Sequence, residues 1–155
     1  MAYVYVNGFI FLDTACDVDQ GWKLFMSNCY KYFNQVERNR AQARLRCQAL
    51  NGNLVMFQNA DKHQFVTSDV LPADYSRVWI GLSRDPANEE VWKWDDGSLL
   101  SFNKWEHNEP KNNHKNCAQM MNGTHYGGRW NNGWHDTHCD NSAGDPGFVC
   151  EREVF

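Results

Sequence analysis

The chain has 155 residues, of which 42% are hydrophobic and 22% charged, with a formal net charge of -4 and an isoelectric point near 5.8. These values describe a globular chain long enough to bury a real core and exclude a disordered one. The acidic balance argues against a nucleic-acid partner, which would require a basic stripe. Because no run of about 20 apolar residues occurs, we expect no membrane span.

Six cysteines, spread from Cys16 to Cys150, set the expected compartment. An even number without any C-x-x-C pair favours three disulfides over a metal cluster, although 15 pairings remain open. Disulfides indicate an oxidising compartment, so we expect a secreted protein, with reduced core cysteines in a cytosolic protein as the alternative. The sequon that begins at Asn122 predicts N-glycosylation and agrees with secretion.

Residues 3–12 read YVYV, Asn7-Gly8 and FIFL, which is a strong β-hairpin signal. The expected organisation is therefore a hairpin extension over residues 1–15, followed by a domain over residues 16–155. Apolar strands of this kind need a cover, either the domain or a second copy, so a homodimer through the hairpin is expected. A signal peptide is the alternative, but it would need a basic start and an uninterrupted apolar run.

Residues 36–50 carry a helical pattern. Ala41, Leu45 and Ala49 recur at i, i+4 and i+8, with basic residues on the other face and Asn51-Gly52 as the stop.

A second helix is expected to start at Asn59 as cap, with Asp61 in its first turn, and to end before Pro72. Its polar and basic residues are interpreted as a solvated face. Its buried side chains are expected to be Phe65, Val66 and Val70.

After Pro72 the pattern becomes short strands and turns, which gives an α+β domain of helices followed by strands. An aromatic run over residues 30–33 is also strand-like, and residues 95–98 form a turn. The expected strands after Pro72 cover residues 78–82, 91–94, 99–102, 117–121 and 147–152.

The segment 105–139 is rich in Asn, Gly and His and is interpreted as a binding surface. Its two tripeptides, Glu109-Pro110-Lys111 and Trp134-His135-Asp136, resemble two halves of one site. No nucleophile motif, phosphate loop or H-E-x-x-H occurs, so no enzyme is expected. A carboxylate pair for glycoside hydrolysis, Glu109 with Asp136, is the enzymatic alternative.

The order of features from about Cys16 to Arg152 resembles a C-type lectin-like domain of the long form, with an extra N-terminal disulfide. The resemblance implies two helices packed on short antiparallel sheets, a long polar binding loop, buried Trp79, Ile80 and Leu82, and a Pro110 position that is often cis. It also implies three disulfides: Cys16–Cys29, Cys47–Cys150 and Cys117–Cys139. The residues that carry it are CDVDQGWKLFMSNCYKYF at the start, Ala43 and Cys47, GNLV at 52–55, WIGL at 79–82, the two tripeptides, and FVCE at 148–151.

Sugar-binding members of that family hold one Ca²⁺ through five ligands, which the resemblance carries over to Glu109, Lys111, Lys115, His135 and Asp136. Only Glu109 and Asp136 retain an oxygen donor of the required kind, whereas Ca²⁺ takes six to eight oxygens. We therefore expect no cofactor and no metal in the usual sugar site, with a lysine ammonium paired to both acids in its place.

Three metal questions stay open in the sequence. A shift of register could bring in Asn112, Asn113 or Asn116, so Ca²⁺ on Glu109 and Asp136 is the alternative. Zn²⁺ on His135, Asp136 and Glu109 is chemically feasible, although surface histidines are the plainer interpretation. The family's auxiliary calcium site is no better matched, since Arg84 and Asn88 fall near two of its acidic positions, although Asp85 and Glu89 are one residue away.

The function expected from these features is that of a secreted lectin that recognises glycans or a glycoprotein surface. Asn side chains offer paired donors and acceptors to sugar hydroxyls, and Trp130 could stack on a sugar ring, while Trp105 and Trp134 are expected in the core. The alternative is a calcium-free protein-binding domain, suited to the Trp, Tyr and Met residues near 119–134. The expected ligand-binding residues are Glu109, Lys111, Asn112, Asn113, Lys115, Trp130, Asn132, His135 and Asp136.

Overall fold

The computed structural model describes residues 3–6, 9–12, 16–34, 39–111, 114–123 and 131–154. The helical elements there are α1 (Arg40–Ala49), α2 (Ala60–Phe65), the 3-10 turn η1 (Val18–Gln20) and the π-helical turn η2 (Val66–Val70). The strands are β1 (Tyr3–Val6), β2 (Phe9–Leu12), β3 (Lys23–Phe25), β4 (Asn28–Phe33), β5 (Asn53–Leu54), β6 (Arg77–Asp85), β7 (Asn88–Trp94), β8 (Cys117–Asn122), β9 (Asn131–Thr137) and β10 (Gly147–Glu153).

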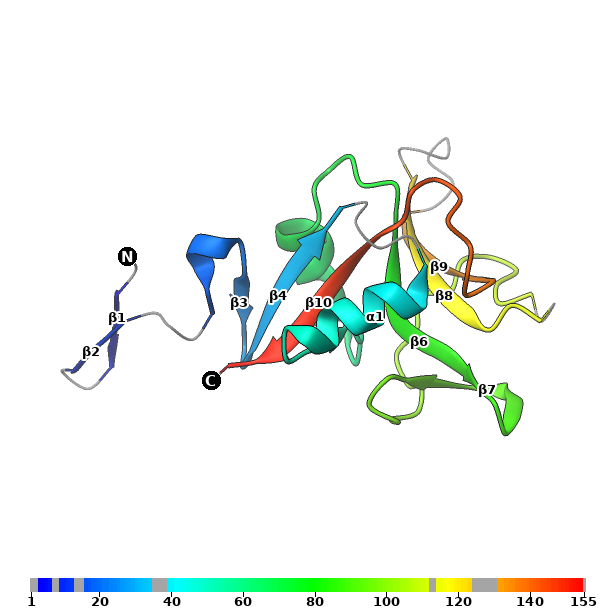
Figure 1. Cartoon of the computed structure of the whole chain (residues 1–155), viewed down its shortest axis with the longest axis horizontal. Helices are drawn as coiled ribbons and strands as arrows, with labels where there is room; N and C mark the ends of the chain where they lie inside the picture. Colours follow the sequence, from blue (N-terminus) through cyan, green and yellow to red (C-terminus); the bar gives the residue numbers. More distant parts are fainter. Residues whose placement is uncertain are drawn as a thin grey trace.

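One mixed sheet of eight strands organises the domain (Figure 1). Its main path runs β3-β4-β10-β6-β8-β9, with β5 paired to β10 and β7 paired to β6. All pairs are antiparallel except β10 with β6, so the expectation of purely antiparallel sheets is wrong at this point. The reason is that the last strand enters the middle of the sheet, where its direction is set by β4 and coincides with that of β6.

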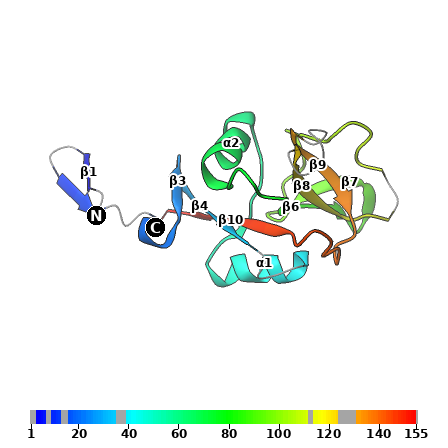
Figure 2. The same ribbon diagram turned by 90° about the horizontal axis from the view of Figure 1, so that it is seen from above.

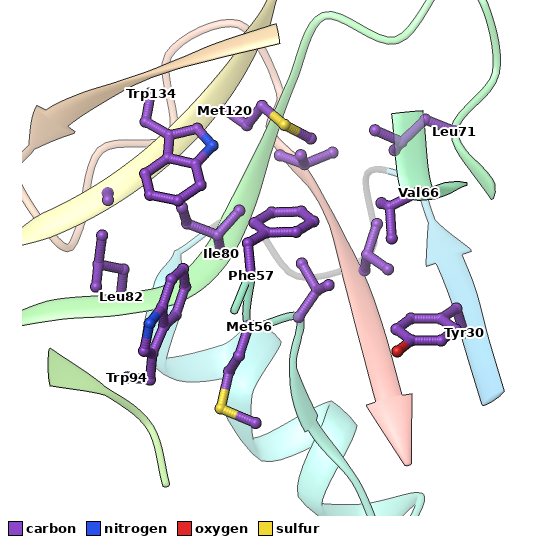
Figure 3. Close-up of a cluster of buried hydrophobic side chains, with 14 of the residues drawn as sticks. Tyr30, Met56, Phe57, Val66, Leu71, Ile80, Leu82, Trp94, Met120 and Trp134 are labelled. Atoms are coloured by element: carbon purple, nitrogen blue, oxygen red, sulfur yellow. The ribbon is translucent and has the colours of Figure 1, made fainter. Parts of the chain in front are cut away.

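The two helices lie on opposite sides of the strands β4 and β10 (Figure 2). On the α1 side, Ala43 and Cys47 pack with Trp79 and Phe148. On the other side a larger core gathers around Phe57 and includes Val66, Ile80, Leu82 and Trp134, as Figure 3 shows. The domain therefore follows the α+β layering expected from the sequence.

Helix α1 buries a different face from the one that the sequence predicts. Its inward residues are Arg40, Ala43 and Cys47, whereas Leu45 is 65% exposed and Ala41 and Ala49 are also exposed. The bond from Cys47 to Cys150 selects the face, because it ties that side of the helix to β10. The helix starts at Arg40 after the cap Asn39, and residues 36–38 of the predicted range lie outside the described residues.

Helix α2 starts where predicted, since the Asn59 side chain accepts from Lys62 N at 2.9 Å. The helical path continues through η2 to Val70, before Pro72, with Val66 buried and Phe65 and Val70 partly buried. The interpretation of its polar residues as a solvated face is wrong for two of them. Lys62 is buried against the Glu151 carboxylate at 2.5 Å, and His63 is 5% exposed.

The predicted strands are found at four of their five positions after Pro72. Residues 99–102 form no strand and contribute only the bridge from Leu99 to Lys93, because the chain turns away after the predicted turn at 95–98. The sequence did not predict β9 as a strand, since its Asn and Gly content hid the pattern.

The three disulfides join the pairs that the resemblance implies. The bond between Cys47 and Cys150 closes a separation of 103 residues. In the chain-entropy account, a loop of about 100 residues gives about 4.7 kcal/mol of stabilisation.

Strands β1 and β2 form a two-stranded sheet of their own, which confirms the predicted hairpin pairing. Figure 1 places it beyond β3, apart from the eight-stranded sheet. Neither helix in the described part of the chain has the length and hydrophobicity that a membrane span requires.

Candidate ligand-binding site

The loop that carries Glu109 is fastened along β9 by backbone hydrogen bonds. Trp134 N donates to Lys104 O at 2.8 Å, and Glu106 N donates to Trp134 O at 2.9 Å. Glycine at position 133 leaves room for the Glu106 side chain, because a β-carbon there would lie 2.2 Å from the present position of its carboxylate. The Trp134 ring anchors the junction, since it is fully buried and lies 5.9 Å from the Trp105 ring. Trp134 is thus in the core, as expected, and Trp105 is partly buried and packs against it.

The two tripeptides of the predicted site meet in the structure. Lys111 N donates to Asp136 Oδ2 at 2.8 Å, and Asp136 N lies 3.4 Å from Glu109 Oε2. The peptide bond between Glu109 and Pro110 is cis, as the resemblance implies. The two acids are therefore neighbours in one site, although 27 residues separate them in sequence.

A lysine ammonium lies on only one of these two acids. Lys111 Nζ is 2.9 Å from Glu109 Oε1, with the Lys111 side chain 51% exposed and the Glu109 side chain 3% exposed. Asp136 instead pairs with the Arg84 guanidinium at 3.3 Å, and both of these side chains are buried. The prediction that one lysine would pair with both acids is therefore wrong for Asp136, because Arg84 reaches it from β6.

Burial shifts the pKa values of two residues of the site, Glu109 and His135. It raises the pKa of the Glu109 carboxyl, an effect that hydrogen bonding to Lys111 opposes and the Asp136 carboxylate adds to. The pKa of His135 falls to about 4, chiefly because of burial and secondarily because of the Arg77 charge. His135 is consequently a neutral imidazole at physiological pH.

The remaining predicted residues take separate places. Lys115 contributes its backbone carbonyl, which accepts from Arg84 Nε at 3.0 Å. The side-chain oxygen of Asn132 accepts from the Tyr75 hydroxyl at 2.5 Å. Asn112, Asn113 and Trp130 lie outside the described residues.

The sequon residue Asn122 is 7% exposed at the end of β8. Its side-chain nitrogen donates to Ala73 O at 2.8 Å. A glycan on that nitrogen requires this hydrogen bond to open, so the geometry disfavours the predicted modification in the folded chain.

The residues of the site do not fit a calcium ion. Three carboxylate oxygens of the two acids are engaged by protein groups. The Lys111 ammonium lies on Glu109 Oε1 and the Asp136 N–H on Glu109 Oε2, while Asp136 Oδ2 accepts from both the Lys111 N–H and Arg84. Lysine side chains at two of the carried-over positions supply no oxygen, and His135 supplies a nitrogen. Among the described residues, no group of three His, Cys, Asp or Glu side chains is arranged to hold a metal.

Arg84 is the main residue of the site that sequence reasoning missed. Its side chain is 5% exposed and lies over the Trp92 ring at 4.5 Å. The sequence contained one indication of this role: Arg84, a cationic residue, falls near a position where the family resemblance implies an acid. Its partner could not be inferred, because Asp136 lies 52 residues later.

The mixed sheet, the two helices on its opposite sides, the three disulfides and the loop closed over β9 together define a C-type lectin-like domain. A profile of the Lectin C-type domain family matches residues 36–152, and the chain belongs to this family.

Two sequence relatives and one solved structure support the same assignment. The chain is 35% identical to human C-type lectin domain family 17, member A, over 86% of this chain and 32% of that protein. It is 33% identical to human lithostathine-1-beta, over 85% of this chain and 76% of the relative. The solved carbohydrate-recognition domain of cow CD23 superposes with a TM-score of 0.72 at 27% identity, over 88% of this chain and 95% of that one.

The chain therefore spans about a third of the first of these relatives. The family includes both lectins and receptors.

Proposed function

We propose that the protein is a secreted, non-enzymatic lectin that binds glycans through the 105–139 surface without Ca²⁺ in the usual sugar site. The proposal rests on one arrangement: the two acids of the site are covered and paired, while neutral and cationic polar groups face solvent. Among the described residues from 105 to 116, the exposed ones are His107, Asn108, Lys111, His114 and Asn116.

This surface suits a sugar because hydroxyl groups need donors and acceptors together. Asn108 and Asn116 carry both kinds of group on an amide, and the Lys111 ammonium adds donors. The buried pairs beneath hold these groups on a fixed base, which limits the entropy lost when a ligand binds.

Glycan-bound relatives support the same proposal. The cow CD23 domain was solved in the presence of a GlcNAc2Man3 oligosaccharide. The domain of murine dendritic cell inhibitory receptor 2, at 25% identity and a TM-score of 0.71, was solved in complex with an N-glycan. Three disulfides support an oxidising, extracellular location.

The test is a glycan array probed twice, in millimolar Ca²⁺ and in EDTA. We expect the same glycans to bind in both buffers. Binding that disappears in EDTA would overturn the calcium-independent part, and a blank array in both buffers would overturn the lectin function.

Two variants locate the surface on any glycan that binds. Asn116→Ala removes an exposed amide at the loop and should weaken binding, whereas Gln48→Ala on the exposed face of α1 should not. Equal affinity of Asn116→Ala and the parent chain for each bound glycan would count against this surface.

The second candidate function is recognition of a protein. It is favoured by the mouse low affinity immunoglobulin epsilon Fc receptor, which is 30% identical over 98% of this chain and 42% of that protein. Among the described Trp and Met residues near 119–134, Met120, Met121 and Trp134 are buried and do not support it. Binding of a glycosidase-treated glycoprotein as tightly as the untreated form would favour this candidate.

The N-terminal hairpin of β1 and β2 supports a homodimer as part of the proposal. A two-stranded sheet alone is marginally stable in water, and β1 and β2 pair only with each other in the described chain. Pairing with the hairpin of a second copy would supply the missing partner and add avidity to a weak sugar site. Sedimentation should give a dimer at micromolar concentration, and a monomer there would contradict this part of the proposal.

A further inference from the structure

Arg84 holds three separate segments of the chain with one buried guanidinium. Its Nε donates to Lys115 O at 3.0 Å, its Nη1 to Glu89 O at 2.6 Å and its Nη2 to Asp136 Oδ2 at 3.3 Å. These acceptors belong to the end of the binding loop, the start of β7 and strand β9. The backbone follows the same pattern, since Arg84 N donates to Asn116 O at 2.9 Å.

We propose that Arg84 is the positioning residue of the binding surface, a fixed internal cation that organises the oxygens a divalent ion would otherwise gather. Two carbonyls and a carboxylate are oxygen donors of the kind that Ca²⁺ takes. A guanidinium is planar, always charged and rich in donors, so it can serve several such acceptors at once. This inference deepens the proposed function and rests on it for the ligand.

The positioning passes from Arg84 to the exposed surface in two contacts. Arg84 fixes the Asp136 carboxylate, and the same oxygen, Oδ2, accepts from Lys111 N at 2.8 Å. The backbone of Lys111 is thereby held where its ammonium reaches Glu109 Oε1 at 2.9 Å. The exposed ammonium of Lys111 is therefore positioned by the buried guanidinium of Arg84, through Asp136.

A buried ion pair that only stabilised the domain would leave the loop unchanged when weakened. Arg40 offers the matched control, because it is also a buried arginine on a carboxylate, with Nη2 2.6 Å from Asp95 Oδ1. Its side chain is 10% exposed. Within the described residues its Nη2 donates to Asp95 and its backbone N to Cys139 O, and neither partner lies in residues 104–116. The two arginines therefore separate general stability from positioning of the loop.

The experiment compares Arg84→Lys, Arg84→Met and Asp136→Asn with Arg40→Met and the parent chain. The first readout is hydrogen exchange of the Lys111 amide, measured on the full chain without any sugar. We expect protection of this amide to fall about tenfold or more in Arg84→Met and Asp136→Asn, and to stay unchanged in Arg40→Met. Arg84→Lys keeps the positive charge but loses the planar set of guanidinium donors, so the fall in Lys111 amide protection should be intermediate.

The second readout is a calcium titration of the parent chain, followed by the NMR shifts of residues 84, 89, 111, 115 and 136. We expect no change at millimolar Ca²⁺. Shifts at those residues, or Lys111 protection that survives in Arg84→Lys and Asp136→Asn, would overturn the inference. If Arg84→Met does not fold, Arg84→Lys and Asp136→Asn decide the question.

The third readout is binding of a glycan identified on the array, which should weaken about tenfold in Arg84→Met and stay unchanged in Arg40→Met. If the parent chain binds no glycan, the proposed function fails, while the exchange and calcium readouts still decide the role of Arg84. If Arg84→Met binds as tightly as the parent chain, the positioning role is wrong and the lectin function stands.

Discussion

Two of the buried ion pairs in the described part of the chain differ in what they support. Under α2, the Lys62 ammonium is 2.5 Å from Glu151 Oε2 and 2.9 Å from Gln58 Oε1, with the Lys62 and Glu151 side chains 8% and 4% exposed. Under the binding loop, Arg84 and Asp136 are equally buried, but they lead to the half-exposed Lys111. The first cluster joins a helix to the sheet, and the second also shapes a surface.

The largest expected loss of stability comes from breaking the buried pair between Lys62 and Glu151 under α2. Lys62→Met should cost about 3–5 kcal/mol of unfolding free energy, because it leaves the Glu151 carboxylate buried without its cation. Urea denaturation measures this cost, and glycan affinity should not change. Replacing both partners, with Lys62→Met and Glu151→Leu, should recover much of the loss; no recovery would mean that the pair is not the cause.

The second effect concerns the disulfide that brackets the binding stretch. The double change Cys117→Ser with Cys139→Ser removes a disulfide between cysteines 22 residues apart. It should lower the unfolding free energy by at least about 3 kcal/mol, the value that the chain-entropy account gives for a shorter loop of about 15 residues. Thermal unfolding in non-reducing buffer measures it. The loss should come with weaker sugar binding, unlike Lys62→Met, and retained affinity would show that the loop is held by its hydrogen bonds alone.

The third effect is a pH dependence from His63, which packs against the buried rings of Phe57 and Trp134. Burial lowers its pKa to about 4, while Nε2 donates to Asn132 O at 3.2 Å. Because the unfolded chain takes up this proton near pH 6.5 and the folded chain only near pH 4, stability should fall as pH drops through that window. His63→Phe should reduce the slope of the melting temperature across the window but not abolish it, because His135 also has a pKa of about 4. His107→Gln, at an exposed histidine, should leave the slope unchanged. A slope in His63→Phe equal to that of the parent chain would assign the dependence to other groups.

The smallest effect is expected from the same Lys-to-Met change at the binding end. Lys111→Met should cost under about 1 kcal/mol, because the half-exposed ammonium gains little from its pair and Glu109 keeps the Asp136 N–H as a partner. Sugar binding should change more than stability does. A cost as large as that of Lys62→Met would erase the distinction between the two places.

Much of the fold could be predicted from the sequence, because the family's spaced motifs are long-range constraints. The disulfide pairs and the meeting of Glu109 with Asp136 came from that resemblance. Local patterns were less secure: the alanine and leucine spacing in α1 indicated a face, but the bond at Cys47 decided which face is buried.

The site could be predicted only in part, because a buried charge depends on a partner far away in sequence. A lysine over Glu109 followed from a neighbour two residues away, whereas Arg84 needed the register of β6 against the loop. Lys62 was misassigned for the same reason, since its partner Glu151 lies on the last strand of the chain. Polar residues in an amphipathic pattern are solvated by default, and only tertiary structure identifies the exceptions.

The position of β10 in the centre of the sheet has a consequence for biosynthesis. β10 pairs with β4, β5 and β6, so their facing edges stay without this partner until synthesis has passed residue 153. Cys150 can join Cys47 only at the same late stage. The nascent chain therefore exposes open strand edges while it is being made, which invites pairing between chains. Its yield should depend on chaperones and oxidases that act after residue 153 has been synthesised.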